Sequence, residues 1–194
     1  MHHIYHTHGF VLSSRNVGEA NKILMIYTRE IGLVRAVVQG IRLNKSKLRF
    51  TLQDLSYVNV DLVKGKEIWR VTSAKPISSF SLARRNTKSL ILITRVSKLL
   101  ERLCPGEVSN EEIFDDLIQA LYILDNTEID PQSRLALELH LILRIMNSLG
   151  YIGDSDILSK YLSSSFDISK TESLLKERQS IISHINKALT ESQL

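Results

Sequence analysis

The fold is decided by YVNVDLVKGKEIWRVT, residues 57–72, because this one stretch predicts a β-hairpin. Apolar and polar residues alternate through residues 57–62, as they do in a strand that buries one face. Lys64-Gly65-Lys66 then supplies a turn, and Ile68 to Thr72 returns as the partner strand. The hairpin predicts an antiparallel sheet in this part of the chain.

Three more strands are predicted upstream, from the same alternation and from glycine turns. They are Phe10 to Ser13, Lys22 to Thr28 and Leu33 to Gln39, with a turn at Glu30-Ile31-Gly32 between the last two. Five strands in about 75 residues is the number found in an OB-type barrel, whose open face commonly binds oligonucleotides. An SH3-like barrel fits the same pattern.

The hydrophobic period becomes helical after Pro76. Apolar residues at helical spacing predict an amphipathic helix from Leu82 to Leu103, ended by Pro105-Gly106. Capping signals predict the remaining helices: Ser109 with Glu112 before a helix through Leu124, Asp130-Pro131 and Gly150 at the two ends of the next, and Ser169 with Glu172 before a last helix through Leu189.

Charge is divided unevenly along the chain. Residues 1–102 contain 18 Lys and Arg against 6 Asp and Glu, whereas residues 103–194 contain 7 against 15. Clustered cations bind a phosphate backbone because they release its condensed counterions. We therefore expect the first half to bind nucleic acid, and accidental clustering on a solvated surface is the alternative.

These patterns together predict an α+β protein with an N-terminal five-stranded OB-fold barrel followed by an all-helical domain. The predicted boundary separates residues 1–79, the nucleic-acid-binding domain, from residues 80–194, a helical bundle for protein interaction. The length of 194 residues is sufficient for two small domains.

The composition excludes several other classes of protein. An apolar fraction of 43% and a charged fraction of 24% are ordinary for a globular chain. The most apolar segment, Leu135 to Met146, contains charged residues and falls short of the roughly 20 residues that a spanning helix needs. The N-terminus lacks a signal-peptide pattern, and the single cysteine cannot form an internal disulfide. A soluble, cytoplasmic, nucleoid-associated protein is expected.

Enzyme motifs are absent from the sequence, which contains no P-loop, GxSxG, HExxH or CxxC pattern. The protein is therefore expected not to be an enzyme and to need no cofactor. Cys104 has no base near it in sequence and follows a helix, so a buried structural thiol is expected.

Two groups of residues resemble metal ligands. His6 and His8, in the cluster with His2 and His3, would share one face of a strand, but no carboxylate or cysteine stands at a ligand spacing. Asp154 and Asp156 precede an apolar segment and are interpreted as a helix N-terminus. No metal site is expected.

The strongest functional signal is the loop that follows the third strand. If Ala36 points into the barrel, the two-residue period of a strand turns Arg35 outward. The loop then presents four cations beside Asn44 and Ser46, a composition suited to phosphate contacts: Arg42, Lys45, Lys47 and Arg49. Lys22 on the second strand and Arg29 just after it complete the predicted DNA-binding set, and Lys64, Lys66 and Arg70 on the hairpin are the next candidates. Base-stacking aromatics are few, and the candidates are Tyr27, Phe50, Tyr57 and Trp69, the last of which is expected in the core.

An ordered series of segments resembles the bacterial recombination mediator family RecO. It consists of Gly9 to Leu12, GEANKIL at 18–24, YTREIG at 27–32, AVVQGIR at 36–42, KSKL at 45–48, Gln53 with the 57–69 hairpin, LLERL at 99–103 before Pro105, and Leu149-Gly150-Tyr151. The resemblance covers about residues 4–153 and is firmest up to residue 80.

The resemblance implies an OB-fold and a helical domain, binding of single- and double-stranded DNA, and strand annealing. It also implies two partners, RecR and single-strand binding protein. Together with RecR, a protein of this family helps RecA to replace single-strand binding protein on gapped DNA. Many family members carry a four-cysteine zinc module after the motif that matches Gly150-Tyr151. Residues 154–169 contain no cysteine, so this chain is expected to be a short form that lacks that module.

The helical half is expected to bind the acidic, apolar tail of single-strand binding protein in an apolar groove rimmed by cations. The candidate cations are Arg95, Lys98, Arg102, Arg134 and Arg144. For each of them, a solvated position on a helix surface is the alternative. Two other functions remain open for the whole chain: an RNA-binding OB protein, since phosphate contacts do not separate RNA from DNA, and a protein-interaction adaptor.

Overall fold

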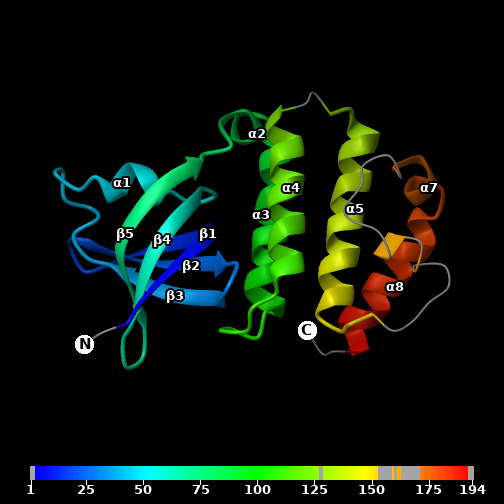
Figure 1. Cartoon of the computed structure of the whole chain (residues 1–194). Helices are drawn as coiled ribbons and strands as arrows, with labels where there is room; N and C mark the ends of the chain where they lie inside the picture. Colours follow the sequence, from blue (N-terminus) through cyan, green and yellow to red (C-terminus); the bar gives the residue numbers. More distant parts are fainter. Residues whose placement is uncertain (1–2, 127–128, 153–158, 160, 163–170, 192–194) are drawn as a thin grey trace. The chain divides into compact units, whose positions relative to one another are not determined.

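A computed structural model describes residues 3–126, 129–152, 159, 161–162 and 171–191 (Figure 1). By its internal contacts the chain groups into two compact units. The first is Met1–Ser81 with Ile93–Glu111, and the second is Leu82–Leu92 with Glu112–Leu194. The predicted domain boundary after residue 79 stays a prediction, because the grouping of contacts does not test whether each part folds independently. The contacts add residues 93–111 to the unit that contains the strands.

The first unit is built on a closed five-stranded barrel, which confirms the predicted OB-type fold (Figure 1). The strands follow the order β1-β2-β3-β5-β4, with β3 and β5 paired in parallel and the other pairs antiparallel. Their bounds are β1 Ile4–Val17, β2 Asn21–Thr28, β3 Gly32–Val38, β4 Tyr57–Lys64 and β5 Trp69–Ser78.

A bulge in β1 exchanges the faces of that strand. Val11 pairs with Ile26 of β2, whereas Ser13 pairs with the next residue, Met25, so Leu12 is the extra residue. Residues with even numbers face outward before the bulge, and residues with odd numbers face outward after it. Because β1 continues to Val17, four residues beyond the predicted end, this exchange places Arg15 on the outer surface.

The barrel interior is filled by apolar side chains from all five strands. Val11, Leu24, Ala36, Val60 and Trp69 belong to one buried cluster, and Trp69 is thus in the core as predicted. A short helix, α1 Leu48–Thr51, contributes Leu48, and Leu52 follows it into the same cluster. The sequence did not predict α1, because four residues are too few for a helical period to be detected.

The segment Ile93–Glu111 is bonded to the outside of β1, β2 and β3. Ser13 donates a hydrogen bond to the Glu101 carboxylate at 2.5 Å, and the Leu33 amide donates to the Gly106 carbonyl at 2.9 Å. The Trp69 indole donates to Glu107 at 2.8 Å from β5. These contacts explain why half of a helix groups with the barrel.

In the residues that the structure describes, these helices follow α1: α2 Ser81–Arg85, α3 Thr87–Leu103, α4 Glu111–Asn126, α5 Pro131–Ser148, α7 Thr171–Lys176 and α8 Arg178–Glu191. The predicted single helix from Leu82 to Leu103 is wrong in one respect, because it is interrupted at Asn86. The Asn86 side chain accepts hydrogen bonds from the amides of Lys88 and Ser89 and so begins a new helix. None of the helices in the described residues is long and apolar enough to cross a membrane.

Within the second unit, α5 packs against α7 and α8, and its predicted ends are confirmed. Asp130 accepts from the amides of Gln132 and Ser133, and Gly150 has φ of 77°, with the Tyr151 amide bonded to the Met146 carbonyl.

The capping box predicted for α4 is wrong. The helix begins at Glu111, and the Glu112 carboxylate accepts hydrogen bonds from Arg144 and Ser148. Asp154, Asp156 and Ser169, on which other caps were predicted, lie outside the described residues.

Gly32 at the start of β3 provides a test of the contact between the barrel and residues 104–108. Its φ is 88°, and a Cβ there would lie 2.3 Å from the Val108 carbonyl oxygen, whereas Gly106, with φ of 94°, has open space around it. Gly106→Ala should lower the free energy of unfolding by about 1–2 kcal/mol through the left-handed backbone alone. Gly32→Ala should cost about 1–3 kcal/mol beyond that, because the backbone must also move apart. Urea unfolding of the two variants measures the difference, and equal losses would contradict the close approach.

Candidate nucleic-acid interface

The loop after β3 is held against the turn between β1 and β2. The Arg42 amide donates to the Ala20 carbonyl at 2.9 Å, and the Arg42 guanidinium donates to the Gly18 carbonyl at 2.9 Å. The Gly40 amide donates to the Asn21 side chain at 2.9 Å. The loop therefore has a defined position at one end of the barrel.

The four loop cations predicted from sequence are all exposed and lie within eight residues: Arg42, Lys45, Lys47 and Arg49. Lys45 and Lys47 make no hydrogen bond or ion pair with any residue that the structure describes. Residues 31–53 contain no acidic residue, so the loop brings no counter-charge of its own. Such a surface attracts a polyanion.

Three more arginines stand on the outer face of the strands. Arg15 pairs in register with Ile23, Ile23 with Val37, and Val37 with Arg70, so one row of side chains crosses β1, β2, β3 and β5. Residues opposite one another in register point to the same side of the sheet, which places both Arg15 and Arg70 on the outside of the closed barrel, at the two ends of this row.

Arg35 lies on this outer surface as well, two residues along β3 from Val37, and it is exposed as predicted. Arg15 was not predicted from the sequence, because the feature that places it is the bulge at Leu12. Arg70 was predicted only as one of the next candidates.

The two remaining predicted DNA contacts lie at opposite ends of β2. Lys22 donates to Ser14 at 3.2 Å and stands beside Asn21, which holds the loop. Arg29 follows the other end of the strand, on the order of 20 Å away, and forms an ion pair with Glu111 at 2.8 Å. The structure therefore groups Lys22 with the loop and separates Arg29 from it.

Three of the four candidate stacking aromatics are buried. Tyr27 is 1% exposed, Trp69 4% and Tyr57 8%, so the prediction that Tyr27 and Tyr57 serve as stacking platforms is wrong. Tyr27 is covered by residues 104–110, and its hydroxyl donates to the Asn110 carbonyl. Phe50 is 69% exposed and remains a candidate.

The predicted partner-binding cations fall into three different settings. Arg95, Lys98 and Arg102 are exposed at helical spacing on α3. Arg134 is half-buried in the wall of a pocket of the second unit, where its guanidinium donates to the Ile129 carbonyl at 2.8 Å.

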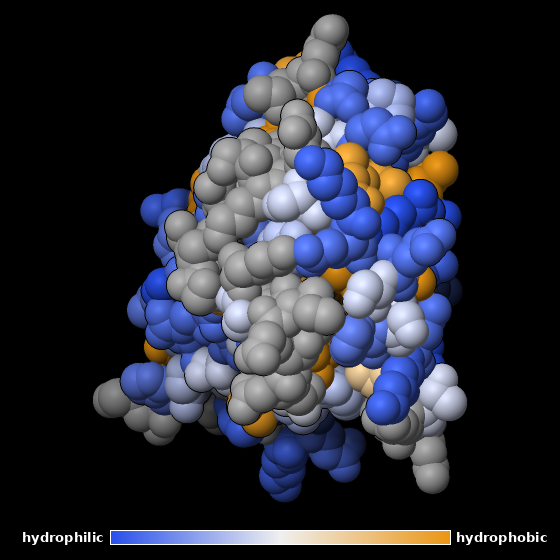
Figure 2. All heavy atoms as spheres, turned by 90° about the vertical axis from the view of Figure 1, so that its right-hand side faces the viewer, coloured by the Kyte–Doolittle hydropathy of each residue, from blue (hydrophilic) through white to orange (hydrophobic). Residues whose placement is uncertain are grey.

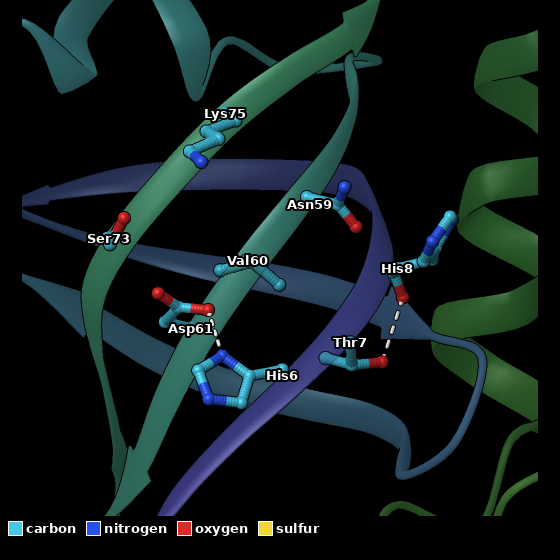
Figure 3. A pocket seen from close by; sticks show the side chains of 8 residues that line it. All are labelled: His6, Thr7, His8, Asn59, Val60, Asp61, Ser73 and Lys75. Atoms are coloured by element: carbon cyan, nitrogen blue, oxygen red, sulfur yellow. Dashed lines mark hydrogen bonds and ion pairs between the residues drawn. The ribbon is translucent and has the colours of Figure 1, made fainter.

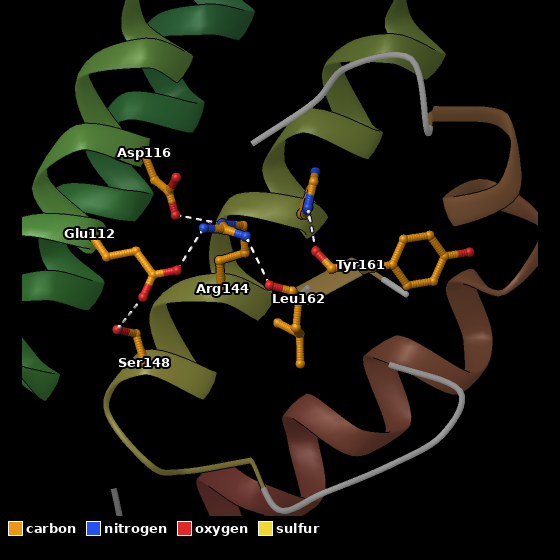
Figure 4. Close-up of polar contacts among 7 residues, drawn as sticks. Glu112, Asp116, Arg144, Ser148, Tyr161 and Leu162 are labelled. Atoms are coloured by element: carbon orange, nitrogen blue, oxygen red, sulfur yellow. Dashed lines mark hydrogen bonds and ion pairs between the residues drawn. The ribbon is translucent and has the colours of Figure 1, made fainter. Parts of the chain in front are cut away.

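Arg144 is buried between α4 and α5 (Figure 4). Its guanidinium donates to Asp116 at 2.5 Å, to Glu112 at 2.7 Å and to the Leu162 carbonyl at 3.3 Å. Burial raises the pKa of Asp116, and the Arg144 hydrogen bond opposes that rise. Arg144 thus connects helices inside the bundle and is not exposed for contact with a partner.

His6 and His8 share the outer face of β1, as predicted, and line a polar hollow with residues of β4 and β5 (Figure 3). His6 contacts the Asp61 carboxylate at 2.6 Å, and His8 contacts the Tyr57 hydroxyl at 2.6 Å. Within the described part of the chain, no group of three or more His, Cys, Asp or Glu side chains could hold a metal ion.

Comparison with known proteins gives the following matches. Residues 1–80 match the family model described as Recombination protein O N terminal. A DNA repair protein RecO of Alkaliphilus metalliredigens is 31% identical over 137 residues, which cover 70% of this chain and 56% of the relative. RecO of Heliobacterium modesticaldum is 30% identical over 148 residues, which cover 76% and 52% of the two chains. RecO of Dehalococcoides mccartyi is 31% identical over 140 residues, which cover 72% and 55%. The chain spans about half the length of the curated relatives it matches.

The reactivity of the Cys104 thiol can be measured to test whether this side chain is buried. Burial raises the pKa of Cys104 to about 11, although a hydrogen bond from Tyr27 opposes the rise. At pH 8 the native thiol should react with Ellman's reagent on the order of 100-fold more slowly than the thiol of the urea-unfolded chain, whose pKa is near 8.5. Since it is the only cysteine, the reaction reports on this site alone. Equal rates in the two states would mean that the thiol is exposed and ionises normally.

Proposed function

We propose that this chain, whose residues 1–80 match the N-terminal family model of recombination protein O and whose relatives include DNA repair proteins RecO, is a recombination mediator that acts by binding DNA rather than by catalysis. The proposal rests on one observation, which is the cationic loop of residues 42–49 held against the turn between β1 and β2 without an acidic neighbour in its own segment. Phosphate contacts of this kind position a protein on DNA without reading its sequence.

The DNA-binding surface we propose contains the loop cations, Lys22 beside them and Arg35 on β3, together with Arg15 and Arg70 from the outside of the barrel. Apolar side chains such as Ile23 and Val37 separate the arginines, so the row spreads positive charge across four strands. Arg29 is a weaker member, because Glu111 already neutralises it.

The mediator activity we propose has two parts. The protein anneals complementary strands, and with RecR it helps RecA to replace single-strand binding protein on gapped DNA. Strand annealing with and without single-strand binding protein is the direct assay. Competition between matched DNA and RNA strands decides the main alternative, an RNA-binding OB protein.

Charge reversal of the loop tests the DNA-binding proposal. The triple substitution Arg42→Glu, Lys45→Glu and Lys47→Glu should abolish DNA binding and annealing. Contact with about four or five phosphates predicts a slope of log K against log salt near −3 to −4 for the unmodified protein on single strands. Fluorescence anisotropy across a salt series measures both quantities.

Two controls accompany that variant. The pair Lys45→Glu and Lys47→Glu removes no hydrogen bond within the described residues and should leave the melting temperature unchanged, since such surface changes move stability by less than about 0.5 kcal/mol. Substitution of Lys176, Arg178 and Lys187, which are exposed on α7 and α8, by glutamate changes the net charge by as much as the triple loop substitution does. This variant should keep a DNA affinity within about twofold of that of the unmodified protein. Unchanged affinity in a folded loop variant would refute the proposed interface.

We also propose a site for the tail of single-strand binding protein, at the pocket that contains Arg134. Leu82, Leu124 and Ile129 supply its apolar wall. The Nε atom of Arg134 is buried and has no hydrogen-bond partner in the part of the chain that is described, and a buried donor of this kind calls for an acceptor. An acidic, apolar peptide would supply both a carboxylate and apolar contacts. Figure 2 shows the side of the molecule that carries α7 and α8, where hydrophilic side chains are mixed with small apolar spots.

Replacement of Arg134 by Met, which retains an unbranched apolar stem, tests the tail site. The affinity for a tail peptide should fall by about 10- to 100-fold, the cost of losing a charged hydrogen bond. Lys176→Met on the exposed face of α7 is the matched control. Calorimetry with the full chain measures both, and a loss on Lys98→Met that exceeds the loss on Arg134→Met would move the site to α3.

A further inference from the structure

Phe50 is exposed on the barrel unit. Its side chain is 69% exposed, the largest fraction among the exposed large hydrophobic residues that the structure describes, while Phe10, Tyr27 and Phe80 are almost completely buried. An exposed aromatic ring gives up the hydrophobic stabilisation that burial would provide. The stability of the barrel therefore does not account for the position of Phe50.

The ring is nevertheless held in one place. Phe50 lies in α1, where the Leu52 amide bonds to the Leu48 carbonyl at 2.9 Å, and both leucines pack on the barrel core. Residues four apart share one side of a helical turn, so the residue midway between them points away from that side. The core contacts of α1 thus fix Phe50 toward solvent.

One cation lies over this exposed ring, and two more are close to it in sequence. The guanidinium carbon of Arg49 lies 4.8 Å from the ring centroid, within the range of a cation–π contact. Arg49 also donates to Asn44 at 3.4 Å, which connects it to the preceding loop. Lys45 and Lys47 stand within five residues of the ring. An aromatic face beside several cations combines the two contacts that single-strand binders use, stacking of a base and neutralisation of its phosphate.

We infer that Phe50 is a stacking platform for an unpaired base, with Arg49, Lys45 and Lys47 on the adjacent phosphates. The inference rests on the proposed DNA binding by the same loop and adds a preference for single strands to it. The bases of a duplex are stacked on one another and cannot reach the ring, so only the phosphate contacts remain for double-stranded DNA. The site lies on α1, outside the β2–β3 face on which OB-folds commonly bind oligonucleotides.

The test compares single-stranded and duplex DNA on the full chain. Phe50→Ala should weaken binding of an oligo(dT) strand about 5- to 150-fold, the effect of one stacked base, and change the affinity for a blunt duplex of equal length by less than about twofold. Phe50→Trp should retain the single-strand affinity of the unmodified protein, because an indole ring stacks on a base at least as well as a phenyl ring does. Tyr122→Ala, which removes an aromatic ring exposed on α4, is the matched control and should change neither affinity.

The outcomes separate this inference from the proposed function. Single-strand affinity that survives Phe50→Ala, while the loop charge reversal abolishes it, would overturn the stacking site and leave the interface in place. Equal losses on single strands and duplex would also overturn it, since the ring would then act only by shaping the loop. If the loop charge reversal leaves DNA affinity unchanged, the proposed interface fails whatever Phe50 does.

Discussion

The parallel pairing of β3 with β5 is the constraint on which the rest of the barrel unit depends. It consists of Ala36 opposite Trp69 and Val37 opposite Arg70, and it closes the sheet. Closure places the Trp69 ring in the core, where its indole N–H is satisfied by Glu107 of the bonded segment 93–111. A closed barrel leaves no strand edge free, so its surface is available for binding through side chains rather than through backbone pairing.

The cations of this protein differ in whether the fold neutralises them. Arg144 lies between Asp116 and Glu112, Arg29 pairs with Glu111, and Lys64 pairs with Glu107, whose pKa this contact lowers. The loop of residues 42–49 has no such acidic partner in its own segment. Cations without an acidic partner are the ones suited to an electrostatic interface. A cation that is already paired with a carboxylate gains little binding free energy when it contacts a phosphate.

Much of the site could be predicted because a strand repeats every two residues. The alternation from Val34 to Val38 was sufficient to turn Arg35 outward, and four closely spaced cations on a polar segment identified the loop. Arg15 could not be found in the same way, since a bulge breaks the alternation without leaving a sequence signal as strong as glycine or proline. The burial of Arg144 was equally hidden, because an arginine on an amphipathic helix has the same pattern whether its face meets water or another helix.

The sequence by itself determined the five strands, the caps of α5, the basic half of the chain and the loop that carries its charge. These features are local, since turns, caps and alternation depend on neighbours within a few residues. Only the tertiary structure decided that Tyr27 and Tyr57 are buried while Phe50 is exposed, and that Arg15 points to the outside of the barrel. Those outcomes depend on which segments distant in sequence cover which face, and neither propensity nor periodicity carries that information.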